Sequence, residues 1–294
     1  MLLGDLAILL VAFIWGATNV VIRDTLKGIT PYWFCALRFT VALLTISFCF
    51  GRRSLAVPRR IKTAGIFTGA VFSAAYLVGA AALLYTTAGN QSFIISTSVV
   101  FVPLCVWLFT RKFPGWHVMA AVAFCVAGMV GLMVDGSFRI NVGDALCFVS
   151  MMCVTAYVLL VGKFVGDTDP YGFSLWQVAG SLAAALVTAL AFEPFPAHLS
   201  KSVWLAIVYA GTIGFALTLV LQTVAQKYTT ATHTAILLST SSIFGSLLGV
   251  IFIGEPMTWR IFTASALILA GVLTVEAAPA LLRKKEDKKH NETS

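Results

Sequence analysis

The most regular feature of the sequence is a series of long apolar runs separated by short polar segments. Each run holds about 20 mostly apolar residues, the length that a helix needs to cross the hydrocarbon core of a bilayer. The runs are too long for the strands of a barrel, and a helix satisfies its own backbone hydrogen bonds in lipid. We expect ten membrane-spanning helices, at Asp5–Ile22, Pro31–Phe50, Thr63–Tyr85, Ala88–Phe109, Trp116–Val134, Gly143–Val161, Pro170–Phe192, Val203–Ala225, Ala231–Ile253 and Met257–Ala278.

The basic residues between these runs predict how the chain is oriented in the membrane. The loops after the second, fourth, sixth and eighth runs, together with the tail, carry 14 Lys and Arg residues, whereas the opposite loops carry 5. Cytoplasmic loops are enriched in Lys and Arg. We therefore expect a multi-pass protein of the cell inner (plasma) membrane with both termini in the cytoplasm.

The composition agrees with a membrane protein. Of the 294 residues, 59% are hydrophobic and only 11% are charged, against roughly 25% charged residues in soluble domains. The mean hydropathy is +0.93. These values exclude a disordered chain, a secreted disulfide scaffold and a typical cytosolic enzyme, because a surface in water needs more charge. The net charge of +8 lies in short clusters between the runs, so we expect the lipid bilayer, and no nucleic acid, as a partner.

The two halves of the chain repeat each other. Asp5 in the first half matches Asp144 in the second, and further along Tyr85–Ala88 matches Tyr228–Ala231. Each half contains five spans, an odd number, so the second half enters the membrane from the opposite side. Inverted repeats are typical of secondary transporters, whose substrate site lies near the membrane midplane between the halves. We expect an all-α polytopic membrane protein built of a first five-helix repeat at residues 1–134, a second inverted repeat at 135–279, and a basic, disordered cytoplasmic tail at 280–294.

Three stretches of the sequence carry a resemblance to a known family. They are Trp15-Gly16-Ala17-Thr18-Asn19, the start of the second run from Pro31 through Arg38-Phe39, and Phe252-Ile253-Gly254-Glu255-Pro256-Met257-Thr258-Trp259. With these residues the chain resembles the drug/metabolite transporter (DMT) superfamily, in its ten-helix EamA-type branch, over nearly its whole length. The resemblance implies efflux or uptake of small metabolites, often amino acids. The first half departs from the pattern, since Thr110–Pro114 stands where the Gly-Glu turn would be repeated.

Arg38 is the strongest candidate for a substrate-binding residue. It is the eighth residue of its span, and an ionisable residue within a span is a functional candidate by default. Its guanidinium can bind a substrate carboxylate through two parallel hydrogen bonds. The alternative is an arginine that extends to the membrane surface or bonds a neighbouring helix. The residue at the matching place in the second half is Gln177, which is polar but uncharged, so the site would be asymmetric.

Other polar and aromatic residues within the spans extend the predicted substrate site. Ser96 and Ser239 belong to two Ser-Thr-Ser strings that the repeat places at matching depth, although such hydroxyls also bond carbonyls of their own helix. Asn90 and His233 occupy repeat-related positions near opposite faces. His233 can titrate near neutral pH and couple protons, or it can be a neutral histidine bonded near a helix end. Six aromatic or amide residues supply further surface within the spans: Trp15, Asn19, Tyr76, Tyr157, Trp176 and Gln222. Trp15 and Tyr157 lie deeper than the aromatic belts at the membrane surface, and the first four residues complete the predicted substrate site.

No enzyme motif is found in the chain. It has no HExxH, no P-loop and no GxSxG sequence, and no segment between the spans is long enough for a nucleotide-binding domain. The six cysteines lie inside apolar runs and form no CxxC pair, so they behave as small apolar residues. We therefore expect a protein that is not an enzyme and has no cofactor and no metal.

The function expected from these patterns is secondary transport of small-molecule substrates. The favoured interpretation is export of small metabolites such as amino acids, by alternating access between the two repeats. The alternatives are an uptake carrier for a vitamin, nucleobase or drug-like cation, and a membrane sensor or assembly subunit that transports nothing. Proton or ion coupling through His233 belongs to the first interpretation. Two GxxxG pairs, Gly65 with Gly69 and Gly245 with Gly249, can serve close contacts within the bundle or in a homodimer.

Overall fold

The regular elements of the described chain are all helical. A computed structural model describes residues 2–25, 28–82, 85, 94–95, 97–133, 142–166, 168–248, 251, 259, 262–263 and 265–274, and no strand occurs among them. The all-α fold class is confirmed. The predicted tail at 280–294 and the string Phe252–Thr258 lie outside the described residues.

The helices follow the predicted apolar runs closely. They are α1 (Leu2–Thr25), α2 (Pro31–Leu55), α3 (Arg59–Ala82), α5 (Ser98–Thr110), α6 (Trp116–Met133), α7 (Val142–Phe164), α8 (Pro170–Phe192), α9 (Lys201–Gly211), the π-helix η1 (Thr212–Leu217), α10 (Thr218–Gln226), α11 (Ala231–Leu238) and α12 (Ser241–Leu248). Residues 265–274 form a further apolar helix in the tenth predicted run.

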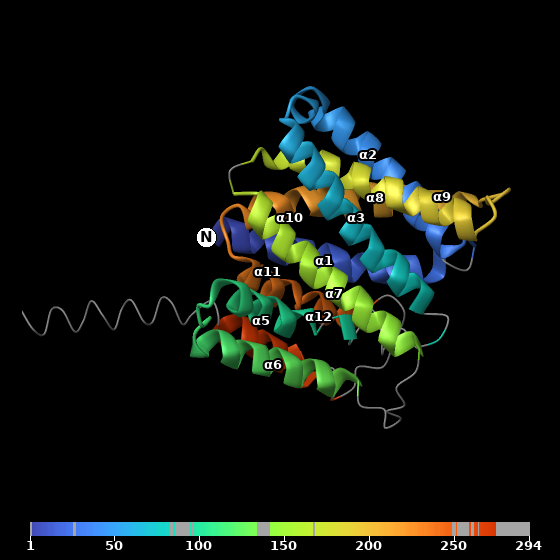
Figure 1. Ribbon diagram of the computed structural model, residues 1–294. Coiled ribbons are helices and arrows are strands. Elements are labelled where there is room, and N and C mark those ends of the chain that lie inside the picture. Colours follow the sequence, from blue (N-terminus) through green and yellow to red (C-terminus); the bar gives the residue numbers. More distant parts are fainter. Residues whose placement is uncertain are drawn as a thin grey trace, which may run out of the picture.

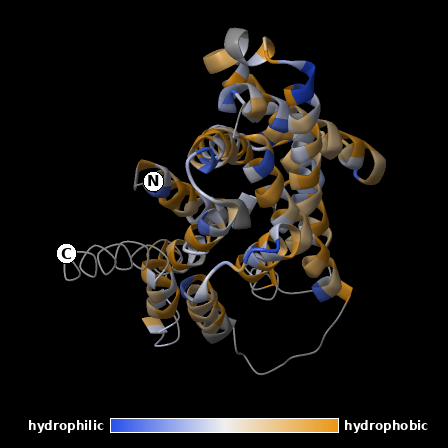
Figure 2. Cartoon of the chain, turned by 60° about the vertical axis from the view of Figure 1, so that its left-hand side comes forward, coloured by the Kyte–Doolittle hydropathy of each residue, from blue (hydrophilic) through white to orange (hydrophobic). Residues whose placement is uncertain are grey.

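By length and composition, five helical segments of the described chain are long and apolar enough to cross a membrane. They are Pro31–Gly51, Arg59–Ala82, Val142–Phe164, Pro170–Phe192 and Lys201–Gln226. The other apolar helical stretches of the described chain are shorter: Leu3–Thr18 within α1, Ser98–Thr110, Trp116–Gly128 and Ser265–Thr274. Large apolar side chains cover the outside of the bundle; Phe48 is 93% exposed and Phe192 is 76% exposed. Figure 2 shows hydrophobic residues along the outer faces of the helices, as a surface that faces lipid requires.

Helix packing repeats itself between the two halves. In the first half α3 packs against α7 and α8, and in the second half the segment α9–η1–α10 packs against α1 and α2. Likewise α5 packs against α7, whereas α11 and α12 pack against α1. Each contact therefore has a counterpart in which the halves exchange roles, which is the arrangement that two inverted five-helix repeats produce (Figure 1).

Glycines bring the repeat-related helices into backbone contact. A Cβ added to Gly69 on α3 would overlap the carbonyl oxygen of Gln177 on α8, and a Cβ on Gly211 would lie 2.7 Å from the carbonyl oxygen of Arg38 on α2. Because Arg38 and Gln177 are repeat partners, the two close approaches are versions of one contact. A Cβ on Gly245 would lie 3.7 Å from the Cα of Gly16. Gly65, Gly69 and Gly245 therefore serve contacts within the bundle.

The π-helix η1 shifts the alignment of the two halves by a single position. Before η1 the repeat pairs Gly69 with Gly211, and after it the repeat pairs Tyr85 with Tyr228, so the second half holds one more amino acid between the two matches. A single wide turn inside an α-helix is the usual form of π-helix and is frequent at functional sites. The inserted amino acid falls where this span passes Arg38.

Glu193 ties the end of α8 to the beginning of α2. Its Oε2 accepts hydrogen bonds from the backbone N–H groups of Tyr32 at 3.1 Å and Trp33 at 3.0 Å. The side chain of the N-cap residue, Thr30, makes no capping hydrogen bond. The carboxylate from another helix therefore satisfies the free N–H groups of the first turn and meets the positive end of the helix dipole.

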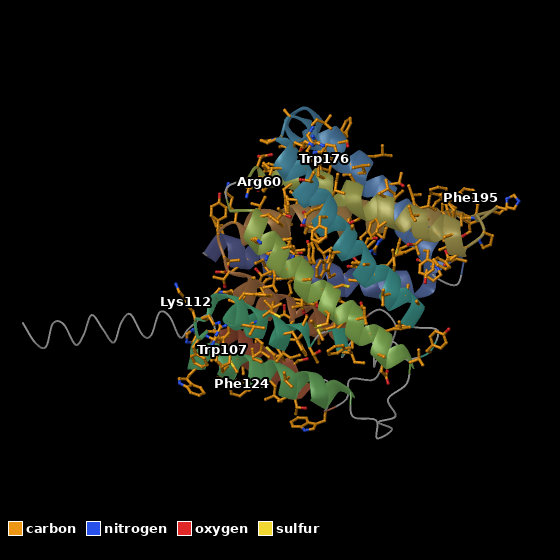
Figure 3. The ribbon with its side chains drawn as sticks, in the orientation of Figure 1. Arg60, Trp107, Lys112, Phe124, Trp176 and Phe195 are labelled. Atoms are coloured by element: carbon orange, nitrogen blue, oxygen red, sulfur yellow. The ribbon has the colours of Figure 1, made fainter. Side chains whose placement is uncertain are left out.

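Basic side chains from two of the predicted loops lie at the same end of the bundle as the N-terminus. Figure 3 shows Arg60 and Lys112 toward the side from which α1 begins, and Phe195 at the opposite end. This is the arrangement that the alternation of basic and non-basic loops predicts for helices that cross the bundle in turn.

Candidate substrate site

A cluster of aromatic rings occupies the place where the two halves meet. Phe72 on α3 and Phe215 on η1 are stacked, with ring centroids 5.6 Å apart and an interplanar angle of 22°. They are also repeat partners, because the alignment that pairs Tyr85 with Tyr228 pairs Phe72 with Phe215. A pair of repeat partners in contact with each other must lie at the pseudo-two-fold axis, so these two rings mark the centre of the fold.

Two tyrosines predicted for the site pack against this pair. The ring of Tyr157 on α7 is stacked on Phe72 with a centroid distance of 4.0 Å, and Tyr76 on α3 meets Phe72 edge-on at 5.0 Å. Tyr157 is 1% exposed, and its hydroxyl donates to Oε1 of Gln222 at 3.4 Å. Both hydroxyls therefore bring polarity to the centre of an otherwise apolar core.

Arg38 points its guanidinium into the aromatic cluster. The guanidinium carbon lies 4.4 Å from the ring centroid of Tyr76, 4.9 Å from that of Phe39 and 5.4 Å from that of Phe215. The side chain is only 4% exposed, and the faces of aromatic rings stabilise a buried cation. Nε and Nη2 are buried and have no hydrogen-bond partner among the described residues.

Burying these two donors without a hydrogen-bond partner raises the free energy of the folded protein. A buried charged donor that makes no hydrogen bond keeps its full desolvation penalty. Nε and Nη2 are neighbouring nitrogens of a planar fork, whose geometry matches the two oxygens of a carboxylate. The arrangement is suited to binding an oxyanion between the aromatic rings.

Trp15 joins the cluster from the first helix. Its indole Nε1 donates to the hydroxyl of Thr218 at 3.1 Å, and its ring is stacked on Phe72 with a centroid distance of 6.4 Å. The hydrogen bond satisfies the indole nitrogen and fixes the ring at the edge of the cluster.

Gln177 is a second buried polar group with an unused donor. It is 0% exposed, its Oε1 accepts from the hydroxyl of Thr223 at 3.2 Å, and its Nε2 has no partner in the part of the chain that the structure describes. Arg38 and Gln177 therefore both keep free N–H groups within that part, and both lie on the helices that the glycine contacts join.

The remaining predicted residues lie outside the aromatic cluster or outside the described part of the chain. His233 is 8% exposed, and its Nε2 lies 3.8 Å from Oδ1 of Asp5, near the beginning of α1. Ser239 donates to the carbonyl of Ile236 at 2.6 Å and lies 3.6 Å from the sulfur of Cys125. The structure thus places these two outside the aromatic cluster. Three predictions fall outside the described residues: Asn90, Ser96 and the side chain of Asn19.

Sequence reasoning missed Phe72, Phe215 and Thr218. The signal that identifies the two phenylalanines is their identity in the alignment of the halves that also pairs Tyr85 with Tyr228. The position of Thr218 has no such signal, because its repeat partner is Ala75 and its role comes from the indole of Trp15.

Comparison with known proteins supports the same fold and class. The EamA-like transporter family matches the chain twice, over residues 2–134 and 141–276. An uncharacterized transporter of Archaeoglobus fulgidus is 27% identical over 277 residues, covering 93% of this chain and 86% of that protein. The uncharacterized transporter YwfM of Bacillus subtilis is 26% identical over 290 residues, covering 94% of both.

One solved crystal structure has the same fold, with a TM-score of 0.81, 18% sequence identity, and coverage of 96% of this chain and 98% of that one. At this identity the likeness concerns the fold alone. The two family matches span both halves of the chain, so the protein belongs to the EamA-like transporter family.

Proposed function

We propose that the protein is a secondary carrier that moves a small carboxylate-bearing metabolite by alternating access between repeats 1–134 and 135–279. The favoured substrates are amino acids and similar zwitterions, and the favoured direction is export. The single observation that carries this proposal is the Arg38 guanidinium, which is 4% exposed and has two nitrogens without a partner among the described residues. A substrate carboxylate at this place would complete both hydrogen bonds.

The place of the cluster supports transport over a structural role for Arg38. An inverted-repeat carrier is expected to hold its substrate near the axis that relates the halves. Phe72 and Phe215 lie at that axis, and Arg38 contacts the ring of Phe215. An arginine needed only for packing would have its nitrogens bonded to helix carbonyls.

We further propose insertion in the inner membrane with both termini in the cytoplasm, supported by the excess of basic residues in the loops on that side. Proton coupling is proposed for His233, supported by its contact with Asp5 inside the bundle. A drug-like cation is a less suitable substrate, because it would meet the positive charge of Arg38. An enzymatic role finds no support in the residues of the cluster.

Counterflow into proteoliposomes tests the proposal. Vesicles that contain the purified chain are loaded with a panel of unlabelled amino acids, other carboxylates, nucleobases and amines, and uptake of the radiolabelled compound is measured. We expect counterflow with a carboxylate-bearing compound. If none of the panel exchanges, the interpretation as a sensor or assembly subunit replaces the carrier.

Substitutions of Arg38 test the role of the guanidinium fork. A hydrogen bond to a charged group contributes about 1.5–3 kcal/mol, so Arg38→Gln should raise KM by about 10-fold to 150-fold. Arg38→Lys keeps the charge but loses the fork and should also be impaired. Arg60→Gln, at an exposed arginine in the first turn of α3, is the matched control and should behave as the wild type. Full transport by Arg38→Gln would reject the proposed role.

A further inference from the structure

A row of buried side chains joined by hydrogen bonds, the amide file, leads away from the aromatic cluster. It begins at Tyr157, whose hydroxyl donates to Oε1 of Gln222 at 3.4 Å. Nε2 of Gln222 donates to Oε1 of Gln226 at 3.3 Å, and Nε2 of Gln226 donates to the carbonyl of Val158 at 3.2 Å. Gln222 is 0% exposed and Gln226 is 3% exposed. The file therefore runs inside the bundle, along the seam between α7 and α10.

The file ends at the face of the bundle where α1 begins. Gln226 is the last residue of α10. Its neighbour Ala225 lies against Gly4 in the first turns of α1, where an added Cβ would be 3.5 Å from the Ala225 carbonyl oxygen. The amides thus extend from the centre of the fold to one of its two ends.

Gln177 lies beside this file and has a free donor. The hydroxyl of Thr223, the residue after Gln222, donates to Oε1 of Gln177 at 3.2 Å. Nε2 of Gln177 is buried, and none of the described residues accepts a hydrogen bond from it. An amide fixed through its oxygen, with its N–H groups unused, is a binding group for an acceptor.

The sequence of the first half carries no polar side chain at the positions related to the glutamines of this file. The repeat partners of Gln222, Thr223 and Gln226 are Gly79, Ala80 and Leu83, whose side chains contain no polar atom. Apolar residues therefore suffice at the related positions of the first half. Buried polar side chains within a membrane are costly, so polar groups confined to one half indicate a function.

We propose that Gln222, Gln226 and Gln177 form the half of the substrate route between the aromatic cluster and the face where α1 begins, with Nε2 of Gln177 as a subsite for an oxyanion. This inference rests on the proposed carrier function and deepens it. Arg38 offers the anion a charged donor, whereas Gln177 offers it a neutral one. The substrate is therefore held more weakly on the Gln177 side of the axis.

Thiol labelling tests the route without any substrate. Gln222→Cys and Gln226→Cys are made singly in the otherwise native chain, and the control is Ala225→Cys. Ala225 lies on the same helix and is 1% exposed, but it packs in a separate apolar cluster with Ile8 and Ile236. The probe is the membrane-impermeant sulfonate reagent MTSES, applied to inside-out and right-side-out vesicles, and peptide mass spectrometry locates each adduct.

We expect Gln222→Cys and Gln226→Cys to react several times faster than Ala225→Cys, from the face where α1 begins. The topology proposed above makes this face accessible in inside-out vesicles. Rates no higher than that of Ala225→Cys, or reaction from the opposite face alone, overturn the route. Because no metabolite is used, this result is independent of the counterflow experiment, which tests the carrier itself.

The subsite is tested by adding Gln177→Leu to Gln222→Cys. Leucine keeps the approximate volume and removes the donor. A hydrogen bond to an anion contributes about 1.5–3 kcal/mol, so the MTSES rate should fall about 10-fold or more, while the rate with the cationic reagent MTSET should stay the same. Equal changes for both reagents, or no change for either, would reject the oxyanion subsite.

Discussion

Among the glycines that the structure describes, Gly69 has the least room for a side chain, because it lies where α3 packs against α8. A Cβ at Gly69 would lie 2.6 Å from the carbonyl carbon and 2.8 Å from the Cα of Gln177, whereas carbon atoms in contact are about 3.5–4.0 Å apart. Both atoms are backbone, so no rotamer change can relieve the overlap. In Gly69→Ala the two helices must separate by roughly 1 Å to restore that contact distance.

The cost of that separation follows from the packing that it weakens. We take the crossing to have about as many atom pairs in contact as one buried leucine, roughly 40–60 pairs at about 0.1–0.2 kcal/mol each. A gap of about 1 Å removes at least a quarter of this dispersion energy, or about 1–3 kcal/mol. Replacing glycine with alanine inside a helix returns about 0.5–1 kcal/mol. The net expectation is a destabilisation of up to about 2.5 kcal/mol, with a central value of about 1 kcal/mol.

Thermal unfolding of the purified protein in detergent measures the effect. At about 2–4 °C for each kcal/mol, Gly69→Ala should lower Tm by about 2–4 °C at the central value and by about 10 °C at most. Gly51→Ala is the matched control, because Gly51 is also helical and a Cβ there meets nothing within 4 Å; it should leave Tm unchanged or raise it. The reasoning is refuted if Gly69→Ala is as stable as Gly51→Ala.

Two further predictions concern the ends of the helices. Glu193→Ala removes the carboxylate that caps α2 and should lower the free energy of unfolding by about 1–3 kcal/mol. Glu193→Gln should lose less, because its amide oxygen still accepts a hydrogen bond. An unchanged Tm in both variants would contradict the capping role. If His233 carries protons, an imposed pH gradient should drive transport in the wild type and in His117→Gln but not in His233→Gln, and equal responses of all three would exclude coupling through His233.

The spans were predictable because they depend on apolar length. The predicted run Pro170–Phe192 is the observed α8. The third helix begins at Arg59 instead of Thr63, because Arg59, Arg60 and Lys62 continue the helix beyond the apolar run. Apolarity does not distinguish a π-turn from an α-turn, so η1 was missed.

The break in the ninth span was also not predicted, and it comes from a local competition for hydrogen bonds. That run was expected as one helix, but it divides into α11 and α12. The hydroxyls of Ser239 and Thr240 donate to the carbonyls of Ile236 and Leu237, three residues earlier in each case. Such bonds compete with the regular helix pattern, which accounts for the turn at these two residues.

The sequence predicts those site residues that can be recognised by their depth within a span. It does not predict those whose role depends on which face of the helix they occupy. Arg38 and Tyr157 were predicted because a charge and a deep tyrosine are uncommon in a span, and the structure places both in the aromatic cluster. Phe72 and Phe215 were missed because they are two of 22 phenylalanines. Ser239 was expected in the site from its depth, but the depth of a residue does not say which neighbour its side chain meets.

If the two halves exchange conformations as proposed, the stacking of Phe72 on Phe215 separates two kinds of control over the carrier. A residue at the axis has equivalent surroundings before and after the exchange, so truncating either ring changes the height of the barrier and the rate of turnover. Arg38 and Gln177 are repeat partners that differ chemically, so under this mechanism they would set the relative populations of the two states. Under the proposed mechanism, substitutions at the axial pair and at the off-axis pair would therefore act on different quantities, the rate of the exchange and the balance between the two states.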